Sequence, residues 1–153
     1  MAPIDFSRFL THQAQEKYKP FIIHGPGLCG KTRFAKLAVE RLTGLAYLDV
    51  LDNLNNHSEL PRIDLFKPAD LRKLLLEFPG PESVVLVDNL DFLLNTWLAA
   101  DKRAFWDLVD HDLGGVAKTF VFIIQDDPEL TGRPMLNTRK ESRVLALAEI
   151  ELV

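Results

Sequence analysis

The sequence predicts an α/β domain built on a five-stranded, mostly parallel sheet. Short apolar segments typical of buried strands alternate along the chain with stretches in which apolar residues recur at helical spacing. A glycine-rich loop connects the first of these apolar segments to a helical stretch. Such alternation is typical of a three-layer domain, in which helices cover both faces of a parallel sheet through right-handed crossovers.

Length and composition fit a single domain over residues 1–153. The net charge of −4 provides no basic footprint, so we expect DNA contact only indirectly or through an assembly. No apolar run approaches the roughly 20 residues of a bilayer span, and the first residues lack the features of a signal peptide. The single cysteine excludes an intramolecular disulfide. We therefore expect a cytoplasmic protein without membrane contact.

The elements can be predicted in order from periodicity and from glycine and proline positions. Residues 4–18 place aromatic and aliphatic side chains among polar ones, as in an amphipathic helix packed on the domain. The remaining predictions are a strand at 21–23, a helix from the glycine-rich loop to Gly44, a strand at 45–50, a surface loop at 52–67, a helix at 68–78, a strand at 83–88, helical stretches at 90–98 and 105–113, a strand at 119–124, a polar segment at 126–141 and a final strand at 144–153.

The glycine-rich loop matches the phosphate-binding pattern G-x-x-x-x-G-K-[ST] between a strand and a helix, which is the context this pattern requires. Its backbone N–H groups and the helix N-terminus would surround phosphates, Lys31 would reach the β- and γ-phosphates, and the Thr32 hydroxyl would bind Mg²⁺. ATP and Mg²⁺ are the expected cofactors. The predicted binding residues are Gly25, Pro26, Gly27, Leu28, Cys29, Gly30, Lys31, Thr32 and Arg33.

A second motif, Val84-Val85-Leu86-Val87-Asp88, consists of four apolar residues that end in a carboxylate. An aspartate at the carboxyl end of a strand can hold the Mg²⁺ coordination sphere of a nucleotide, so Thr32 and Asp88 are the predicted metal ligands. Asn89 follows, and an amide can orient water but cannot accept a proton as a general base. Asp91 is a candidate base in its place, and the alternative is a residue that caps the next helix.

The segment Val87-Asp88-Asn89-Leu90-Asp91, with Gln125 and Ser142-Arg143-Val144, resembles the AAA+ branch of P-loop ATPases, which includes bacterial replication initiators. The resemblance implies that Gln125 senses the γ-phosphate and that Arg143 is an arginine finger acting across a dimer or ring contact. The usual base position holds Asn89, and we expect no C-terminal helical lid. Size and layout are closer to the BrxF family, small P-loop proteins of BREX phage-defence systems.

This resemblance implies a bacterial ATP-binding component of a multi-protein antiphage machine, with larger defence-system proteins as partners and with slow or partner-dependent hydrolysis. Two alternatives keep the nucleotide site: a nucleotide-gated adaptor without turnover, and a regulator similar to AAA+ replication initiators. A small-molecule kinase is a further alternative, for which the basic run from Arg133 to Arg143 would have to supply the lid.

Overall fold

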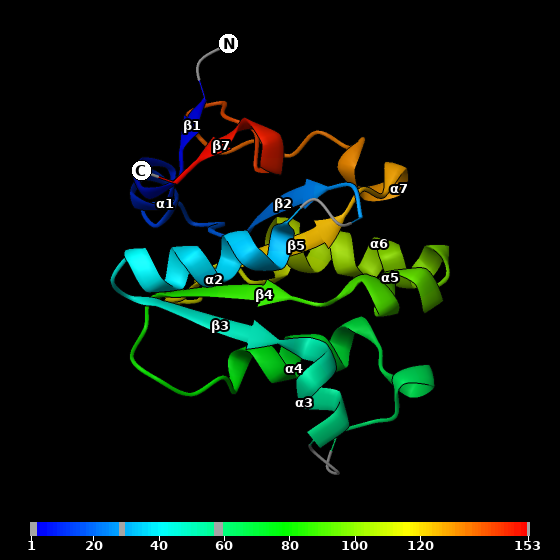
Figure 1. Ribbon diagram of the computed structural model, residues 1–153. Helices are drawn as coiled ribbons and strands as arrows, with labels where there is room; N and C mark the ends of the chain where they lie inside the picture. The colour runs from blue at the N-terminus through cyan, green and yellow to red at the C-terminus, as the bar shows by residue number, and fades with distance from the viewer. Residues whose placement is uncertain (1–2, 28–29, 57–59, 153) are drawn as a thin grey trace.

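The computed structural model describes residues 3–27, 30–56 and 60–152. Figure 1 shows the elements, in which η1 and η3 are short 3-10 turns and η2 is a π-helix. In chain order they are β1 (Ile4–Asp5), α1 (Phe6–Gln13), β2 (Phe21–Gly25), α2 (Lys31–Arg41), β3 (Leu45–Asp49), α3 (Val50–Asn56), η1 (Ile63–Leu65), α4 (Pro68–Leu76), β4 (Val84–Asp88), α5 (Asp91–Thr96), α6 (Ala99–Asp107), η2 (Leu108–Asp112), β5 (Thr119–Gln125), α7 (Pro128–Thr131), β6 (Val144–Ala146), η3 (Leu147–Glu149) and β7 (Ile150–Glu151).

Five strands form one sheet in the order β3-β4-β5-β2-β6, and every neighbouring pair is parallel. The predicted α/β class with a five-stranded parallel sheet is therefore confirmed. Because the strands are parallel, their carboxyl ends meet at one edge of the sheet (Figure 1). The order also places β5 between β2 and β4, the two strands that end at the predicted phosphate loop and at Asp88.

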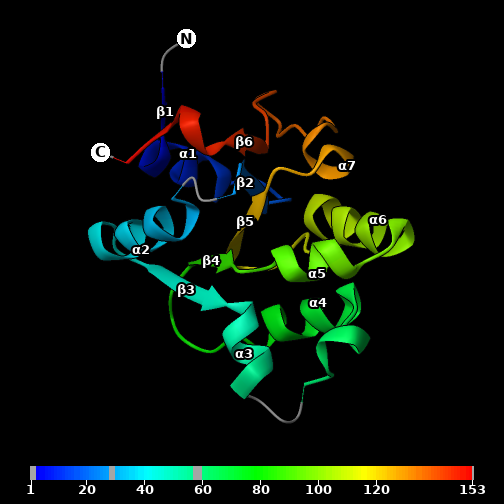
Figure 2. The same ribbon diagram turned by 45° about the vertical axis from the view of Figure 1, so that its right-hand side comes forward.

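Alternate residues of the strands point to two separate cores, as the two-residue period of a strand requires. Ile22 and Phe122 face the core that α4, α5 and α6 cover, whereas Ile23 and Val121 face the core that α1 and α2 cover. Figure 2 shows these two groups of helices on opposite sides of the sheet. Both faces are buried, which explains why the strands are almost continuously apolar in sequence.

The N-terminal segment differs from the predicted helix over 4–18. Ile4 and Asp5 form the short strand β1, which pairs in parallel with β7. The helix α1 covers only Phe6–Gln13. The Asp5 carboxylate accepts a hydrogen bond from the Arg8 N–H at 3.1 Å, so it acts as an N-cap and fixes the start of the helix. At the other end, the Gln13 side chain donates to the Tyr18 carbonyl at 2.9 Å and holds the turn that follows.

The segment predicted as a strand over 144–153 is divided in the structure. β6 ends at Ala146, the 3-10 turn η3 follows, and β7 leaves the main sheet to pair with β1 (Figure 1). Val153 lies outside the described residues. The apolar character of this segment therefore serves two different sheets, a distinction that periodicity alone does not make.

The predicted surface loop over 52–67 contains the turn η1 and most of the helix α3, which begins at Val50. Residues 57–59 lie outside the described residues. Three asparagines in this segment favour a loop because their side chains compete for backbone hydrogen bonds. In the structure the Asp49 carboxylate accepts from the Asp52 N–H at 2.9 Å, and this bond caps the first turn of α3.

Arg143, the predicted arginine finger, is an internal residue that is only 2% exposed. Its guanidinium donates to the carbonyls of Pro20 and Val109, at 2.9 Å each, and to the carbonyl and carboxylate of Asp110 at 3.3 Å. Burial lowers the pKa of Arg143, and the negative charge of Asp110 opposes this shift. This placement ties β6 to η2 and to the entry of β2. It differs from the exposed position that a finger acting in trans requires.

We predict that Arg143→Ala lowers the free energy of unfolding by about 2–6 kcal/mol, because the buried carbonyls of Pro20 and Val109 lose their donor at about 1–3 kcal/mol each. Urea denaturation followed by circular dichroism measures the change. Arg139→Ala provides the control, because Arg139 is exposed and its loss should cost no more than about 0.5 kcal/mol. A loss below about 1 kcal/mol for Arg143→Ala would contradict an internal structural role.

Candidate functional site

The predicted phosphate loop and the predicted second motif share one cavity. The cavity, of about 420 Å³, lies at the carboxyl edge of the sheet, between the N-terminus of α2 and the segment that follows β4. Its lining consists of Gly30, Lys31, Thr32, Arg33, Asp88, Asn89 and Asp91. All seven are residues that the sequence selects as site residues, although the two groups are far apart in the chain.

The loop leaves β2 at Gly25 and enters α2 at Lys31. Gly30 has a φ of +88°, in the left-handed region where glycine carries no steric penalty, so its place in the pattern has a local backbone reason. The Lys31 ammonium folds back and donates to the Pro26 carbonyl at 3.2 Å. Leu28 and Cys29 lie outside the described residues.

A hydrogen bond connects the two motifs directly. The Thr32 hydroxyl donates to Oδ2 of Asp88 at 2.7 Å, and Asp88 is only 3% exposed. The Tyr47 hydroxyl donates to the same oxygen at 2.7 Å. Burial and the bond to Asp88 raise the pKa of Tyr47, so the phenol stays protonated and remains a donor. The carboxylate of Asp88 is thus oriented from two sides.

The donor set at this position fits a Mg²⁺ ion that is shared with a nucleotide. Thr32 and Asp88 would supply two oxygen ligands, and residues 3–27, 30–56 and 60–152 contain no cluster of three His, Cys, Asp or Glu side chains that could hold a metal alone. Mg²⁺ prefers oxygen ligands, retains several waters and commonly completes its sphere with phosphate oxygens. The two protein ligands are therefore enough for a Mg²⁺–nucleotide complex.

Asn89 has an unusual backbone conformation and a defined side-chain partner. Its φ is +59°, in the left-handed region that asparagine tolerates better than most residues. Its Nδ2 donates to Oδ2 of Asp49, at the end of β3, at 2.7 Å. Asn89 therefore contacts the Asp49 carboxylate of the neighbouring strand and also lines the cavity.

Asp91 is the first residue of α5, and the N-cap position belongs to Leu90. The alternative that Asp91 caps this helix therefore differs from the structure, in which its Oδ1 accepts from the Gln125 N–H at 2.7 Å. Burial raises the pKa of Asp91, and the negative charge of Asp88 adds to this effect, whereas the bond from Gln125 and the charge of Lys31 oppose it. Asp91 thus connects the segment after β4 to the end of β5.

The side chain of Gln125 is exposed and lies beside the loop, because a methyl group placed on Gly27 would be 3.9 Å from its Nε2. The structure therefore brings Gln125 to the phosphate loop, as a γ-phosphate sensor requires, and leaves Arg143 inside the domain.

Two residues of the site, Tyr47 and Asp49, are absent from the sequence prediction. They are two residues apart on β3, and Asp49 is in register with Asp88 on the neighbouring strand. The available signal was the polar end of the predicted strand at 45–50. It becomes informative only once β3 is known to lie next to β4, because then the carboxyl ends of both strands meet.

A second cavity, of about 430 Å³, touches the opposite end of the phosphate loop. It is lined by His24, Gly25 and Pro26 together with Asp126 and the turn after β6, residues 146–148. In its wall, the His24 Nδ1 and the Asp126 carboxylate lie at a hydrogen-bond distance of 2.7 Å. The loop therefore has a charged cavity at its α2 end and a more apolar one at its β2 end.

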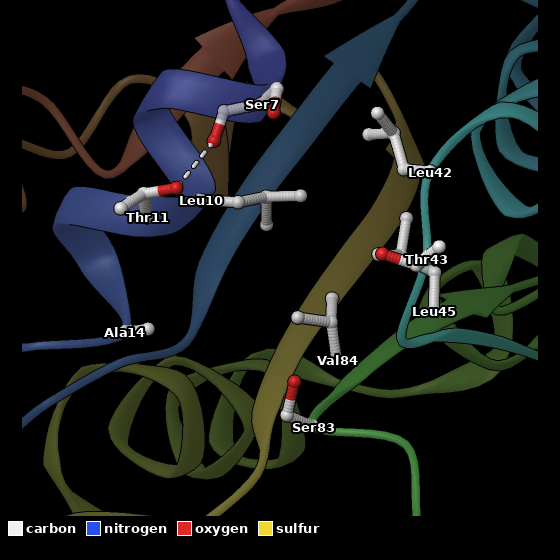
Figure 3. Close-up of a pocket in the computed structure, with 9 residues that line it drawn as sticks. All are labelled: Ser7, Leu10, Thr11, Ala14, Leu42, Thr43, Leu45, Ser83 and Val84. Carbon is white, nitrogen blue, oxygen red and sulfur yellow. Dashed lines mark hydrogen bonds between the residues drawn. The ribbon is translucent and has the colours of Figure 1, made fainter.

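Figure 3 shows a third cavity, of about 330 Å³, at the amino ends of β3 and β4. The drawn hydrogen bond joins the Thr11 hydroxyl to the Ser7 carbonyl within α1 at 3.1 Å. None of the nine lining residues is charged, and the cavity lies at the sheet edge opposite Asp88: they are Ser7, Leu10, Thr11, Ala14, Leu42, Thr43, Leu45, Ser83 and Val84. It contributes nothing to the site at the phosphate loop.

Comparisons of the chain with protein-family models, with curated proteins and with solved structures find no match. Across the part of the chain that the structure describes, every helix is too short or too polar to span a bilayer.

We predict that Asp91→Ala destabilises the fold by about 0.5–1.5 kcal/mol, because the exposed Gln125 N–H exchanges its acceptor for water. Asp91→Asn keeps an oxygen at this position and should cost less.

The raised pKa of Asp91 also implies a pH dependence with a definite sign. The folded protein binds this proton more tightly than the unfolded chain, so the favourable contribution is present at low pH and is lost as the pH rises through the folded pKa.

The free energy of unfolding of the wild type, minus that of Asp91→Asn, should therefore fall as the pH rises above the ordinary value of 3.8. Parallel urea titrations between about pH 3 and pH 7 measure this difference, the range in which an aspartate with a raised pKa ionises. A difference that rises with pH would contradict the assigned environment of Asp91.

Proposed function

We propose that this protein binds ATP with Mg²⁺ as a P-loop NTPase of the AAA+ type and hydrolyses it slowly or with the help of a partner. The observation that carries the proposal is the hydrogen bond of 2.7 Å from the Thr32 hydroxyl to the Asp88 carboxylate, in a cavity that Lys31 also lines. The Thr32 hydroxyl and the Asp88 carboxylate would hold Mg²⁺, and the Lys31 ammonium, which now donates to the Pro26 carbonyl, would donate to phosphate oxygens.

The strand order supports this assignment. In the additional-strand class of P-loop ATPases, a further strand separates the strand of the phosphate loop from the strand of the metal aspartate. Here β5 lies between β2 and β4, and it carries Gln125 at its carboxyl end. The class therefore fits both the topology of the sheet and the position of the candidate γ-phosphate sensor.

The two cavities at the ends of the loop suggest how the nucleotide lies. Lys31 and Asp88 would hold the phosphates and the metal in the charged cavity, and the cavity lined by His24 and the segment 146–148 would accept the base. The backbone amides of the first turn of α2 would donate to the phosphates, and the N-cap residue Gly30 has no side chain to block them.

Slow turnover follows from two features of the site. Asn89 cannot accept a proton, so water attacking the γ-phosphorus depends on positioning, with Asp91 as the nearby carboxylate in the same cavity. Among the described residues the cavity is lined by one arginine, Arg33, which is exposed. Additional positive charge for the transition state would have to come from another protein, because Arg143 is committed to internal bonds.

The resemblance to the BrxF family suggests that this partner belongs to a multi-protein antiphage system, in which the ATP-bound state of this small domain regulates assembly or activity. A nucleotide-gated adaptor without turnover is the second candidate, and the amide at position 89 favours it. Single-turnover measurement of phosphate release from bound ATP separates the two, because the adaptor retains ATP intact.

We predict that Lys31→Ala weakens ATP binding about 10- to 100-fold, since a charge-assisted hydrogen bond contributes about 1.5–3 kcal/mol. Isothermal titration calorimetry with Mg²⁺ and ATP measures the affinity, and circular dichroism verifies folding. Arg41→Ala is the matched control, because Arg41 is an exposed cation at the other end of α2. Equal affinity of wild type and Lys31→Ala would overturn the proposed nucleotide site.

We also predict that the purified protein alone releases fewer than about one phosphate per second, at or below the low end of typical enzyme turnover numbers. Asp88→Asn should lower the rate further and weaken the dependence of ATP binding on Mg²⁺, because one metal ligand loses its charge. A rate of tens per second for the isolated wild type would show that the site is complete without a partner.

A further inference from the structure

The strand β3 places two polar side chains behind the residues of the proposed nucleotide site. Tyr47 donates to Asp88, and Asp49 accepts from Asn89. Both hydrogen bonds measure 2.7 Å between donor and acceptor, and both connect β3 to the carboxyl end of its neighbour β4. Tyr47 therefore orients the metal aspartate, while Asp49 contacts the residue at the position where a catalytic base is usual.

Asp49 divides its two carboxylate oxygens between two tasks. Oδ1 accepts from the Asp52 N–H at 2.9 Å and caps α3, and Oδ2 accepts from the Asn89 amide. An ionised carboxylate can only accept hydrogen bonds, so it must face Nδ2 of Asn89 and not Oδ1. The orientation of the Asn89 amide is thereby determined, and its Oδ1 becomes the end that can face the cavity.

We propose that Asp49 is a positioning residue for ATP hydrolysis, which fixes the Asn89 amide so that its carbonyl oxygen accepts a hydrogen bond from the attacking water. The inference rests on the proposed function. A carbonyl oxygen in this position can orient water, as a glutamine amide does in other phosphoryl-transfer sites, although it cannot take the proton. The negative charge of Asp49 also polarises the amide and strengthens its oxygen as an acceptor.

Asp49 and Asn89 can be exchanged for each other, because aspartate and asparagine side chains have nearly the same shape. In Asp49→Asn, Oδ1 can still cap α3, because asparagine is as good an N-cap as aspartate, but the new Nδ2 meets the Nδ2 of Asn89. The Asn89 amide must then turn and present its NH₂ group to the cavity. In Asn89→Asp alone, two carboxylates face each other. In the double variant, a carboxylate at position 89 accepts from an amide at position 49, and the hydrogen bond is restored with opposite polarity.

The backbone accepts these changes. Aspartate tolerates the left-handed conformation at position 89 nearly as well as asparagine. A fourth variant, Asp49→Ser, isolates the capping task, since serine is also a good N-cap but is too short to replace the carboxylate that Asn89 binds. If Asp49 only caps α3, both Asp49→Asn and Asp49→Ser should hydrolyse ATP like the wild type.

The test compares wild type, Asp49→Asn, Asp49→Ser, Asn89→Asp and the double variant by phosphate release and by calorimetric ATP affinity. We expect Asp49→Asn and Asp49→Ser to bind ATP within about twofold of wild type and to lower kcat about 10- to 100-fold, the scale on which misplacement of a reacting group acts. The double variant should recover at least the wild-type kcat, which a sum of the two single effects does not predict.

The outcomes separate this inference from the proposed function. If the wild type does not bind ATP, the proposed function fails and the inference fails with it. If ATP is bound and hydrolysed but Asp49→Asn leaves kcat unchanged, or if the double variant is no faster than the slower single variant, only the inference is overturned. The double variant also keeps the test readable when wild-type turnover is slow, because its carboxylate at position 89 should then hydrolyse ATP faster than the wild type.

Discussion

Parallel pairing of the five strands is the constraint on which the rest of the structure depends. Because every strand of the main sheet runs in the same direction, the last residues of β2, β3, β4 and β5 meet at one edge. The two-residue period then divides the remaining side chains between two cores and leaves few polar groups except at this edge. The site therefore requires no special loop architecture beyond the glycine-rich turn before α2.

The strands and most helices of the main body could be predicted because their patterns are local. Apolar runs mark β4 and β5, and Pro68 marks the start of α4. Two of the errors occur where a single side chain decides an element's boundary. The Asp5 carboxylate caps α1, so the helix begins at Phe6 and Ile4 lies outside it. The Asp49 carboxylate caps α3, in a segment whose composition favours a loop. Neither role can be distinguished from an ordinary surface aspartate before the partner N–H group is known.

The site shows the same division. Lys31, Thr32 and Asp88 could be selected from motifs of defined spacing, and the structure brings all three to one cavity. Arg143 was selected by analogy, and the structure buries its guanidinium against the carbonyls of Pro20 and Val109. Tyr47 and Asp49 were missed because their importance arises from the neighbour relation between β3 and β4, which no single stretch of sequence contains.

The left-handed backbone at Asn89 limits which residues can occupy the position next to Asp88. For most residues this conformation lowers the free energy of unfolding by about 1–2 kcal/mol, whereas the cost is smaller for asparagine, aspartate and glycine. A glutamate introduced here would carry both this steric cost and a repulsion from Asp49. Substitution at position 89 is thus restricted to a few short residues, and the conformation of one peptide unit limits which side chains can lie next to Asp88 in the cavity.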